Sequence, residues 1–149
     1  ELGVSKLDVF CGINSPKKFH AAEKQHMLKR WQRITSEASK QCERHFPPEI
    51  QFYPDIYIAL ETLSECPNSW LLDPEIVDTV SWKKLTRSGD DLIKHHRLLI
   101  GPEGGFHQDE IKLSLRSGMR PVNLGPRILR TETAAITAVS ILQFLWGDL

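Results

Sequence analysis

The loop at residues 101–105 has the residue types that a ligand site needs. Gly104 and Gly105 let the backbone approach a bound group closely, and Pro102 stiffens the turn. Glu103 offers an acceptor to a ligand amine or hydroxyl. The loop matches neither the phosphate-binding pattern GxxxxGK[ST] nor the dinucleotide-binding pattern GxGxxG, which disfavours both classes of nucleotide site. By itself, a plain tight turn explains the loop equally well.

A second loop, at residues 125–132, places two guanidinium groups beside apolar residues. Arg127 and Arg130 flank an apolar pair, and Glu132 stands where a helix is expected to begin. Such a segment is suited to hold an adenine or thioether group through its backbone while the arginines face an anion. An ordinary strand-to-helix connection with solvated charges is an equally consistent interpretation.

Predicted strands precede both loops and place them together. Apolar runs at residues 97–100 and 121–124 are typical of buried strands. A helix is expected over residues 109–117, and another runs to about Trp146, with Thr131 or Thr133 as its cap. Alternating strands and helices predict a parallel α/β sheet, whose ligand crevice lies outside the carboxyl ends of the strands. Both loops should therefore converge there.

The N-terminal half of the chain predicts a strand, a long helix, a shorter helix and another strand. These cover residues 6–10, about 23–45, 54–63 and 69–72. The long helix should carry one polar face, for which a solvated surface with ion pairs is the simplest explanation. That face contains Arg30, Arg33, Glu37, Gln41 and Arg44. Residues 73–96 give no clear pattern beyond a turn at 88–90.

The net charge of zero is an average over unlike segments. Residues 1–50 contain nine Lys and Arg against six acids, and residues 81–149 contain ten against seven. Residues 51–80 contain six acids and no Lys or Arg. The balance excludes a uniformly basic nucleic-acid binder but leaves a polyanionic partner open. We expect the acidic segment, which holds no candidate site residue, to face away from such a partner.

The cysteine and histidine spacing indicates no metal site. Three widely spaced cysteines and six histidines form no CxxC, HxxxH or HExxH pattern, which favours reduced thiols in a cytoplasmic protein. The longest apolar run is too short to span a bilayer. We therefore expect no metal and no membrane segment.

Taken together, the two loops resemble one known family. The stretches LIGPEGGF (99–106) and VNLGPRILRTETA (122–134) closely resemble the RsmE family of 16S rRNA uridine-N3 methyltransferases in the SPOUT superfamily. The opening ELGV, the segment EASKQCER (37–44) before Pro48, and the closing Gly147-Asp148 are similar to that family too. Residues 51–96 contribute little to the resemblance.

The resemblance implies a fold, a cofactor and partners. The fold is a SPOUT-type α/β knot, a mostly parallel sheet flanked by helices with a C-terminal trefoil knot, forming one methyltransferase domain over residues 1–149. Relatives carry an N-terminal RNA-binding β-barrel before the position of Glu1, so we expect this chain to be part of a longer protein. The expected partners are 16S rRNA in the small ribosomal subunit and a second copy in a homodimer. The implied S-adenosylmethionine site comprises Ile100, Gly101, Pro102, Glu103, Gly104, Gly105, Leu124, Gly125, Ile128, Leu129, Arg130, Thr133 and Ala134.

Site roles follow from the same resemblance and from the chemistry of methylating a protonated nitrogen. Arg130 and Arg127 are expected to stabilise charge developing on the uracil oxygens, with Glu132 as the base or as an organiser of the arginines. Arg44, Gln41 and Arg127 are the candidate RNA contacts.

One departure keeps other functions open. The chain reads Gly-Ile-Asn-Ser at residues 12–15, where relatives usually have a Thr/Ser-Glu-Arg-Ser stretch. If that Arg holds RNA, substrate or activity differs here. A non-catalytic rRNA-binding or ribosome-assembly module that retains the cofactor fold is the competing hypothesis. A small-molecule nucleotide-binding enzyme is supported by the Gly-rich loop alone.

Overall fold

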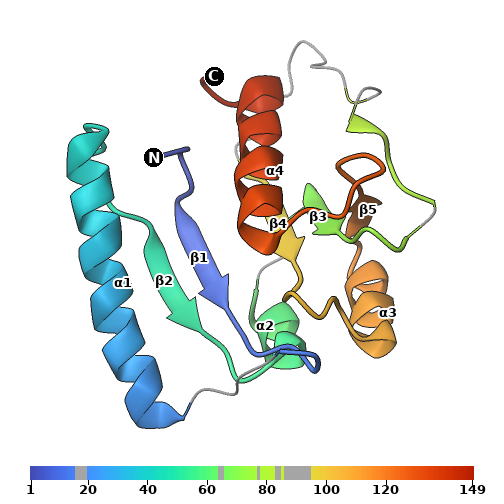
Figure 1. Cartoon of the computed structure of the whole chain (residues 1–149), viewed down its shortest axis with the longest axis horizontal. Helices are drawn as coiled ribbons and strands as arrows, with labels where there is room; N and C mark the ends of the chain where they lie inside the picture. Colours follow the sequence, from blue (N-terminus) through green and yellow to red (C-terminus); the bar gives the residue numbers. More distant parts are fainter. Residues whose placement is uncertain (16–19, 64–65, 77, 83–84, 86–94) are drawn as a thin grey trace.

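The computed structural model describes residues 1–15, 20–63, 66–76, 78–82, 85 and 95–149, and the turn expected at 88–90 lies outside them. Two parallel sheets form its framework (Figure 1). Strands β1 (Lys6–Val9) and β2 (Glu49–Phe52) pair with each other, with Lys6 opposite Glu49. The second sheet has the order β4-β3-β5, formed by Arg97–Ile100, Ser69–Leu72 and Arg120–Val122. The predicted parallel α/β fold is confirmed.

The three-stranded sheet is buried on both faces, because successive apolar side chains along its strands point to opposite sides. Leu71 of β3 is fully buried in one core cluster with Leu99 of β4 and with Ile111 of α3 (Gln108–Arg116). Trp70 and Leu72 point to the other face, where Ala138 of α4 (Thr131–Trp146) joins them. The sheet is therefore the middle layer between α3 on one face and α4 on the other.

The short helix and α3 begin where side chains cap the free backbone N–H groups. In α2 (Ile56–Thr62), Asp55 accepts from the Ile58 N–H at 2.9 Å. At α3, the N–H of His107 donates to Glu110 at 2.8 Å.

The last helix departs from the predicted cap. The predicted caps Thr131 and Thr133 were both wrong, since the N-cap of α4 is Arg130 and its side chain makes no capping bond. The hydroxyl of Thr131 instead donates to the Gly101 carbonyl at 3.4 Å, which ties α4 to the loop after β4.

The long helix α1 (Ala21–Gln41) is shorter at its end than the pattern predicted. It stops because Glu43 adopts a left-handed conformation, with φ of 58°. The N–H of Arg44 then donates to the Ser39 carbonyl at 2.9 Å, and that of Glu43 to the Lys40 carbonyl at 3.3 Å. These two bonds form a Schellman motif. Arg44 consequently lies beyond the helix and outside its polar face.

Strand β2, which the sequence did not reveal, joins α1 to the rest of the molecule. Trp31 of α1 stacks on Phe52 of β2 with ring centroids 5.3 Å apart. The side-chain amide of Gln143 in α4 donates to the Leu2 carbonyl at 2.8 Å, which links the N-terminal segment to α4. The β1–β2 unit thus packs beside the larger sheet (Figure 1).

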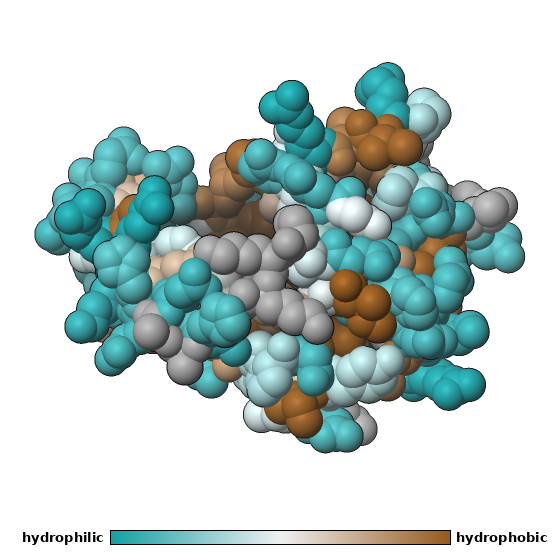
Figure 2. Space-filling model, turned by 60° about the horizontal axis from the view of Figure 1, so that its bottom comes forward, coloured by the Kyte–Doolittle hydropathy of each residue, from teal (hydrophilic) through white to brown (hydrophobic). Residues whose placement is uncertain are grey.

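The surface over α1 is mostly hydrophilic, at the left of Figure 2. Arg30, Arg33, Glu37 and Gln41 are all exposed there, as the predicted polar face requires. Within the described part of the chain, no helix is long and apolar enough to cross a membrane, and no group of His, Cys, Asp and Glu side chains is arranged to hold a metal ion.

Candidate cofactor site

A cavity of about 500 Å³ lies where three loops leave the carboxyl ends of β3, β4 and β5. The predicted convergence of the two glycine loops is confirmed, and the segment after β3 joins them. The lining residues are Leu72, Asp73, Pro74, Ile100, Gly101, Pro102, Glu103, Gly105, Phe106, Asn123, Leu124, Gly125, Arg127, Ile128, Leu129, Arg130, Thr131, Glu132 and Ala134.

Most residues predicted for a cofactor line this cavity, and so do the three predicted for catalysis, Arg127, Arg130 and Glu132. Gly104 and Thr133 do not line it. Of the residues predicted to contact RNA, only Arg127 reaches the cavity. Gln41 is exposed at the end of α1. The cavity therefore brings together most residues predicted for the cofactor and for catalysis, whereas the residues predicted to contact RNA are spread over the molecule.

The loop after β4 is shaped by its glycines and by an aromatic ring. A Cβ on Gly101 would stand 3.1 Å from the ring of Phe106, which is itself buried. Gly105 has φ of 70°, and its N–H closes the turn on the Pro102 carbonyl at 2.9 Å. No atom lies within 4 Å of a Cβ placed on Gly105. The backbone is thus open toward the cavity where a ligand has to approach it.

Gly104 is needed for a different reason. A Cβ there would come within 2.9 Å of the Asn14 carbonyl oxygen. The Asn14 side-chain amide lies 3.4 Å from the carbonyl oxygens of both Gly104 and Gly105. The turn at residues 12–15 therefore packs directly against the first glycine loop.

Glu110 connects these two segments through hydrogen bonds. Its side chain is 1% exposed, and its two oxygens accept from the N–H groups of Ile13 at 2.9 Å and His107 at 2.8 Å. A buried carboxylate is stable only when such donors replace its hydration. Glu110 thus holds residues 12–15 and the first glycine loop in a fixed relation.

The segment after β3 was missed by sequence reasoning, which expected no site residue between 51 and 80. Asp73 is only 3% exposed and lines the cavity, and its Oδ1 accepts from the Glu75 N–H at 2.8 Å. One sequence signal could have indicated Asp73. It directly follows an apolar run, and the carboxyl end of a strand in a parallel sheet is where ligands bind. Part of the acidic segment therefore borders the site, at Leu72, Asp73 and Pro74.

The cavity combines an apolar floor with charged rims. Its floor includes Phe106 and Leu72, both buried. Arg127, Arg130 and Glu132 are exposed at its edge. Such a cavity can hold a ligand with an apolar body and a few polar groups, and its volume lies in the range of about 300–1,000 Å³ typical of small-molecule sites.

Arg44 has a structural partner. Its guanidinium donates to the Val4 carbonyl at 2.8 Å, so it ties the end of α1 to the start of β1. This contact uses one of its five N–H donors.

A family model described as an RNA methyltransferase domain matches residues 1–143. The chain belongs to this RNA methyltransferase domain family. Curated relatives named ribosomal RNA small subunit methyltransferase E share the domain. The protein from Buchnera aphidicola of Acyrthosiphon pisum is 37% identical over 125 residues, covering 81% of this chain and 46% of the relative. The one from Aquifex aeolicus is 34% identical over 146 residues, covering 96% and 58%. The chain thus spans about half the length of these relatives.

Two solved structures share the fold. A methyltransferase from Legionella pneumophila, in complex with the cofactor SAM, is similar with a TM-score of 0.86 and 34% identity. The ribosomal RNA small subunit methyltransferase E of Neisseria gonorrhoeae, bound to S-adenosylmethionine, gives 0.79 and 29%. Each comparison covers 99% of this chain and 58% of the other.

Proposed function

We propose that this domain binds S-adenosylmethionine in the loop cavity and methylates N3 of a uridine in 16S rRNA of the small ribosomal subunit. The supporting observation is that eleven of the thirteen residues predicted for the cofactor line one cavity. That cavity belongs to a chain resembling two methyltransferases solved with this cofactor. The competing rRNA-binding or assembly module would share the cavity and lack the transfer.

The residues present fit this cofactor. Its adenine and thioether portions suit the apolar floor, and the open backbone at Gly105 and Gly125 leaves room for polar contacts to main-chain groups. Buried Asp73 offers an acceptor to a hydroxyl or ammonium group. When bound, S-adenosylmethionine supplies the methyl group to be transferred.

The charged residues at the rim act on the acceptor. Arg130, together with Arg127, stabilises negative charge on the uracil oxygens as N3 loses its proton. Glu132 lines the same cavity and acts as the base or as an organiser of the two guanidinium groups. Arg44 and Gln41 contact the RNA outside the cavity. Alignment of the two reactants supplies most of the rate enhancement.

We also propose the knot and the dimer that the resemblance implies. The order β4-β3-β5 and the packing of α4 across this sheet are compatible with a C-terminal trefoil knot. On α4, Ile136 and Phe144 are 59% and 70% exposed, eight residues apart and so on one face of the helix. This apolar face is suited to pair with a second copy in a cytoplasmic homodimer.

Calorimetry with S-adenosylmethionine tests the cofactor site. Leu129→Trp places a large ring in the cavity and should weaken binding at least about tenfold, because the ring competes with the ligand for the same volume. Leu115→Trp is the matched control, since Leu115 is partly exposed on α3 and does not line the cavity. Equal binding by both variants would place the cofactor elsewhere.

Methyl transfer is then measured on small ribosomal subunits with tritiated cofactor. The native protein should label the rRNA, and Arg130→Ala should lose at least about 100-fold in rate while staying folded, because one stabilising donor is removed. Full activity of Arg130→Ala would disprove its role. Cofactor binding by the native protein without any labelling would favour the non-catalytic module.

A further inference from the structure

The turn after β1 contacts the first glycine loop from outside the cavity. A Cβ on Gly104 would stand 2.9 Å from the Asn14 carbonyl oxygen, so the two backbones touch. The Asn14 side-chain amide lies 3.4 Å from the carbonyl oxygens of both Gly104 and Gly105. Gly105 lines the cavity, whereas residues 12–15 do not. The turn is therefore placed to support the loop without meeting a ligand.

Hydrogen bonds hold the turn itself in place. The N–H of Gly12 donates to the Ser15 hydroxyl at 2.9 Å, and the Ser15 N–H donates back to the Gly12 carbonyl at 3.1 Å. The N–H of Ile13 donates to the Glu110 carboxylate at 2.9 Å. Because Glu110 is 1% exposed on α3, this bond ties the turn to the core. Asn14 is thus presented on a fixed backbone.

The contact with Asn14 determines which way two peptide groups of the loop face. In a trans peptide, the carbonyl and the following N–H point in opposite directions. The Gly104 carbonyl faces Asn14, and the N–H of Gly105 accordingly points the other way, to the Pro102 carbonyl at 2.9 Å. The Gly105 carbonyl also faces Asn14. The N–H of Phe106 therefore points away from the turn.

The Phe106 N–H is an available donor at the cavity. Phe106 is 7% exposed and lines the cavity. Among the described residues, no acceptor lies within hydrogen-bond distance of its N–H. In so buried a residue, a backbone N–H that lacks an acceptor is unfavourable. A ligand in the cavity can supply the acceptor.

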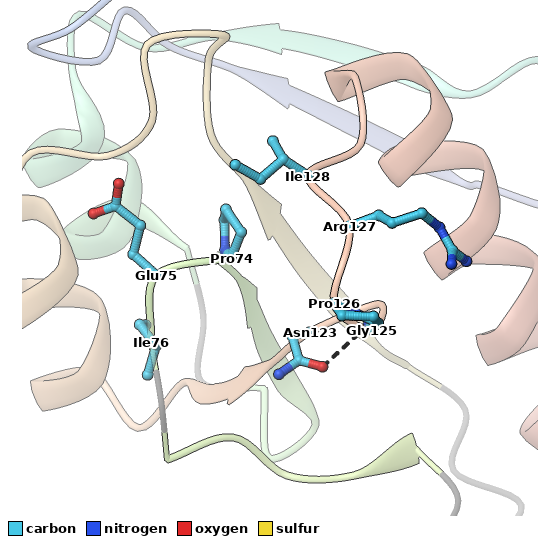
Figure 3. A pocket seen from close by; sticks show the side chains of 8 residues that line it. All are labelled: Pro74, Glu75, Ile76, Asn123, Gly125, Pro126, Arg127 and Ile128. Atoms are coloured by element: carbon cyan, nitrogen blue, oxygen red, sulfur yellow. Dashed lines mark hydrogen bonds between the residues drawn. The ribbon is translucent and has the colours of Figure 1, made fainter.

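The second glycine loop is held by an asparagine of its own. The Oδ1 of Asn123 accepts from the Gly125 N–H at 3.2 Å, the bond drawn in Figure 3. Its Nδ2 donates to Thr79 at 2.8 Å. The first loop, at residues 101–105, contains no amide side chain. Asn14 supplies that contact from 90 residues away in the chain.

We propose that Asn14 is a positioning residue for the cofactor. It fixes the carbonyls of Gly104 and Gly105 on the outer side of the loop, and it thereby holds the Phe106 N–H as a donor to a polar group of S-adenosylmethionine. This inference rests on the proposed function, because the cavity has to be the cofactor site. Asn14 acts through the loop and does not itself touch the ligand.

Calorimetry with S-adenosylhomocysteine, which lacks the sulfonium charge, measures the effect of Asn14. Asn14→Asp keeps the shape of the side chain but replaces its donor by a carboxylate, which repels the two carbonyl oxygens. Binding should weaken at least about fivefold in Asn14→Asp and about threefold in Asn14→Ala. Gln32→Glu is the matched control, because it makes the same amide-to-carboxylate change on the exposed face of α1. Its dissociation constant should stay within about twofold, since a solvated charge is screened.

Nuclear magnetic resonance on the ¹⁵N-labelled protein distinguishes positioning from a general loss of structure. In the native protein, S-adenosylhomocysteine should shift the Phe106 amide proton downfield, because the ligand accepts its hydrogen bond. At saturating ligand this shift should be smaller in Asn14→Asp, while the signals of α1 stay unchanged. Asn14→Ala, which adds no charge, carries the same test should Asn14→Asp fail to fold.

Three results distinguish this inference from the proposed function. If the native protein does not bind S-adenosylhomocysteine, the proposed function fails and the positioning role fails with it. If it binds, and the Asn14 variants bind equally well or keep the full Phe106 shift at saturation, the positioning role is wrong while the cofactor site stands. Weaker binding with a reduced Phe106 shift and native α1 signals supports the role.

Discussion

At the scale of single residues, the buried Glu110 carboxylate shows how one side chain fixes two distant segments. It accepts from backbone N–H groups that lie 97 and three residues away in the chain. One belongs to the turn after β1, and the other begins α3. The charge is tolerated inside the protein because both donors replace water. Burial together with two acceptor oxygens gives Glu110 this role.

Glu110→Gln should lower the free energy of unfolding by about 1–3 kcal/mol, because the new amide group turns a donor toward a backbone N–H that then lacks an acceptor. Denaturation by urea measures the change. The control is Glu37→Gln on the exposed face of α1, where the pair with Lys40 at 3.6 Å is solvated and the loss should stay within about 0.5 kcal/mol. Equal losses in both variants would contradict the bracing role of Glu110.

Two residues near the candidate site show what the sequence could not predict. Gly104 was expected beside the ligand, whereas the structure explains the glycine by the backbone of Asn14, 2.9 Å from a Cβ at that position. Neighbours that are distant in the sequence decide such contacts, and spacing does not reveal them. Asp73 was not predicted at all, because its burial follows from the strands on either side of β3.

At the scale of elements, strands with strong apolar runs were predictable and the short amphipathic one was not. The run that forms β4 matched its predicted bounds. Strand β2 (Glu49–Phe52) has only four residues, alternates exposed with half-buried positions, and follows two prolines that indicate a turn. Its existence depends on pairing with β1, which is more than 40 residues away in sequence. Local pattern cannot supply that information.

The end of α1 gives a prediction at this scale. Glu43→Gly should raise the free energy of unfolding by up to about 1 kcal/mol, because glycine adopts the left-handed conformation at φ 58° without the steric cost that glutamate bears. Thermal unfolding followed by circular dichroism measures the change. The same substitution inside the helix, Glu37→Gly, should lower stability by about 1 kcal/mol. A loss of stability in Glu43→Gly would show that the glutamate side chain stabilises this end.

At the scale of the whole molecule, an aromatic cluster joins the second sheet to the last helix. The His96 ring stacks on Trp146 of α4 at 4.7 Å and on Trp70 of β3 at 6.4 Å between centroids. The Trp70 indole N–H donates to His96 Nδ1 at 3.2 Å, and Arg120 lies over the Trp70 ring at 4.0 Å. A protonated His96 would direct a second donor at the indole N–H. The cluster is therefore built for a neutral imidazole.

Stability should consequently fall as the pH drops below about 6.5. Burial, and then the positive charge of Arg120, lower the pKa of His96 from 6.5. Between that lowered pKa and 6.5 the unfolded chain binds a proton that the folded chain does not, so the free energy of unfolding decreases with decreasing pH. Urea denaturation between pH 5 and 8 measures it.

Variants separate His96 from other ionising groups. The acid-side decrease should be smaller in His96→Gln than in the native protein, after both curves are aligned at pH 8. The exposed His45 provides the control, and His45→Gln should keep the native slope. A native slope in His96→Gln would exclude the aromatic cluster as its source.

The same cluster determines what tryptophan fluorescence can report about motions of this protein. Three of the four tryptophans, Trp70, Trp82 and Trp146, belong to the packing between the second sheet and α4, and the fourth, Trp31, lies on α1 against β2. Fluorescence emission is therefore weighted toward the layer that borders the candidate cofactor cavity, and a variant lacking Trp31 would report on that layer alone. Comparing this variant with the native protein would separate detachment of α4 from the sheet from release of α1 from its strand.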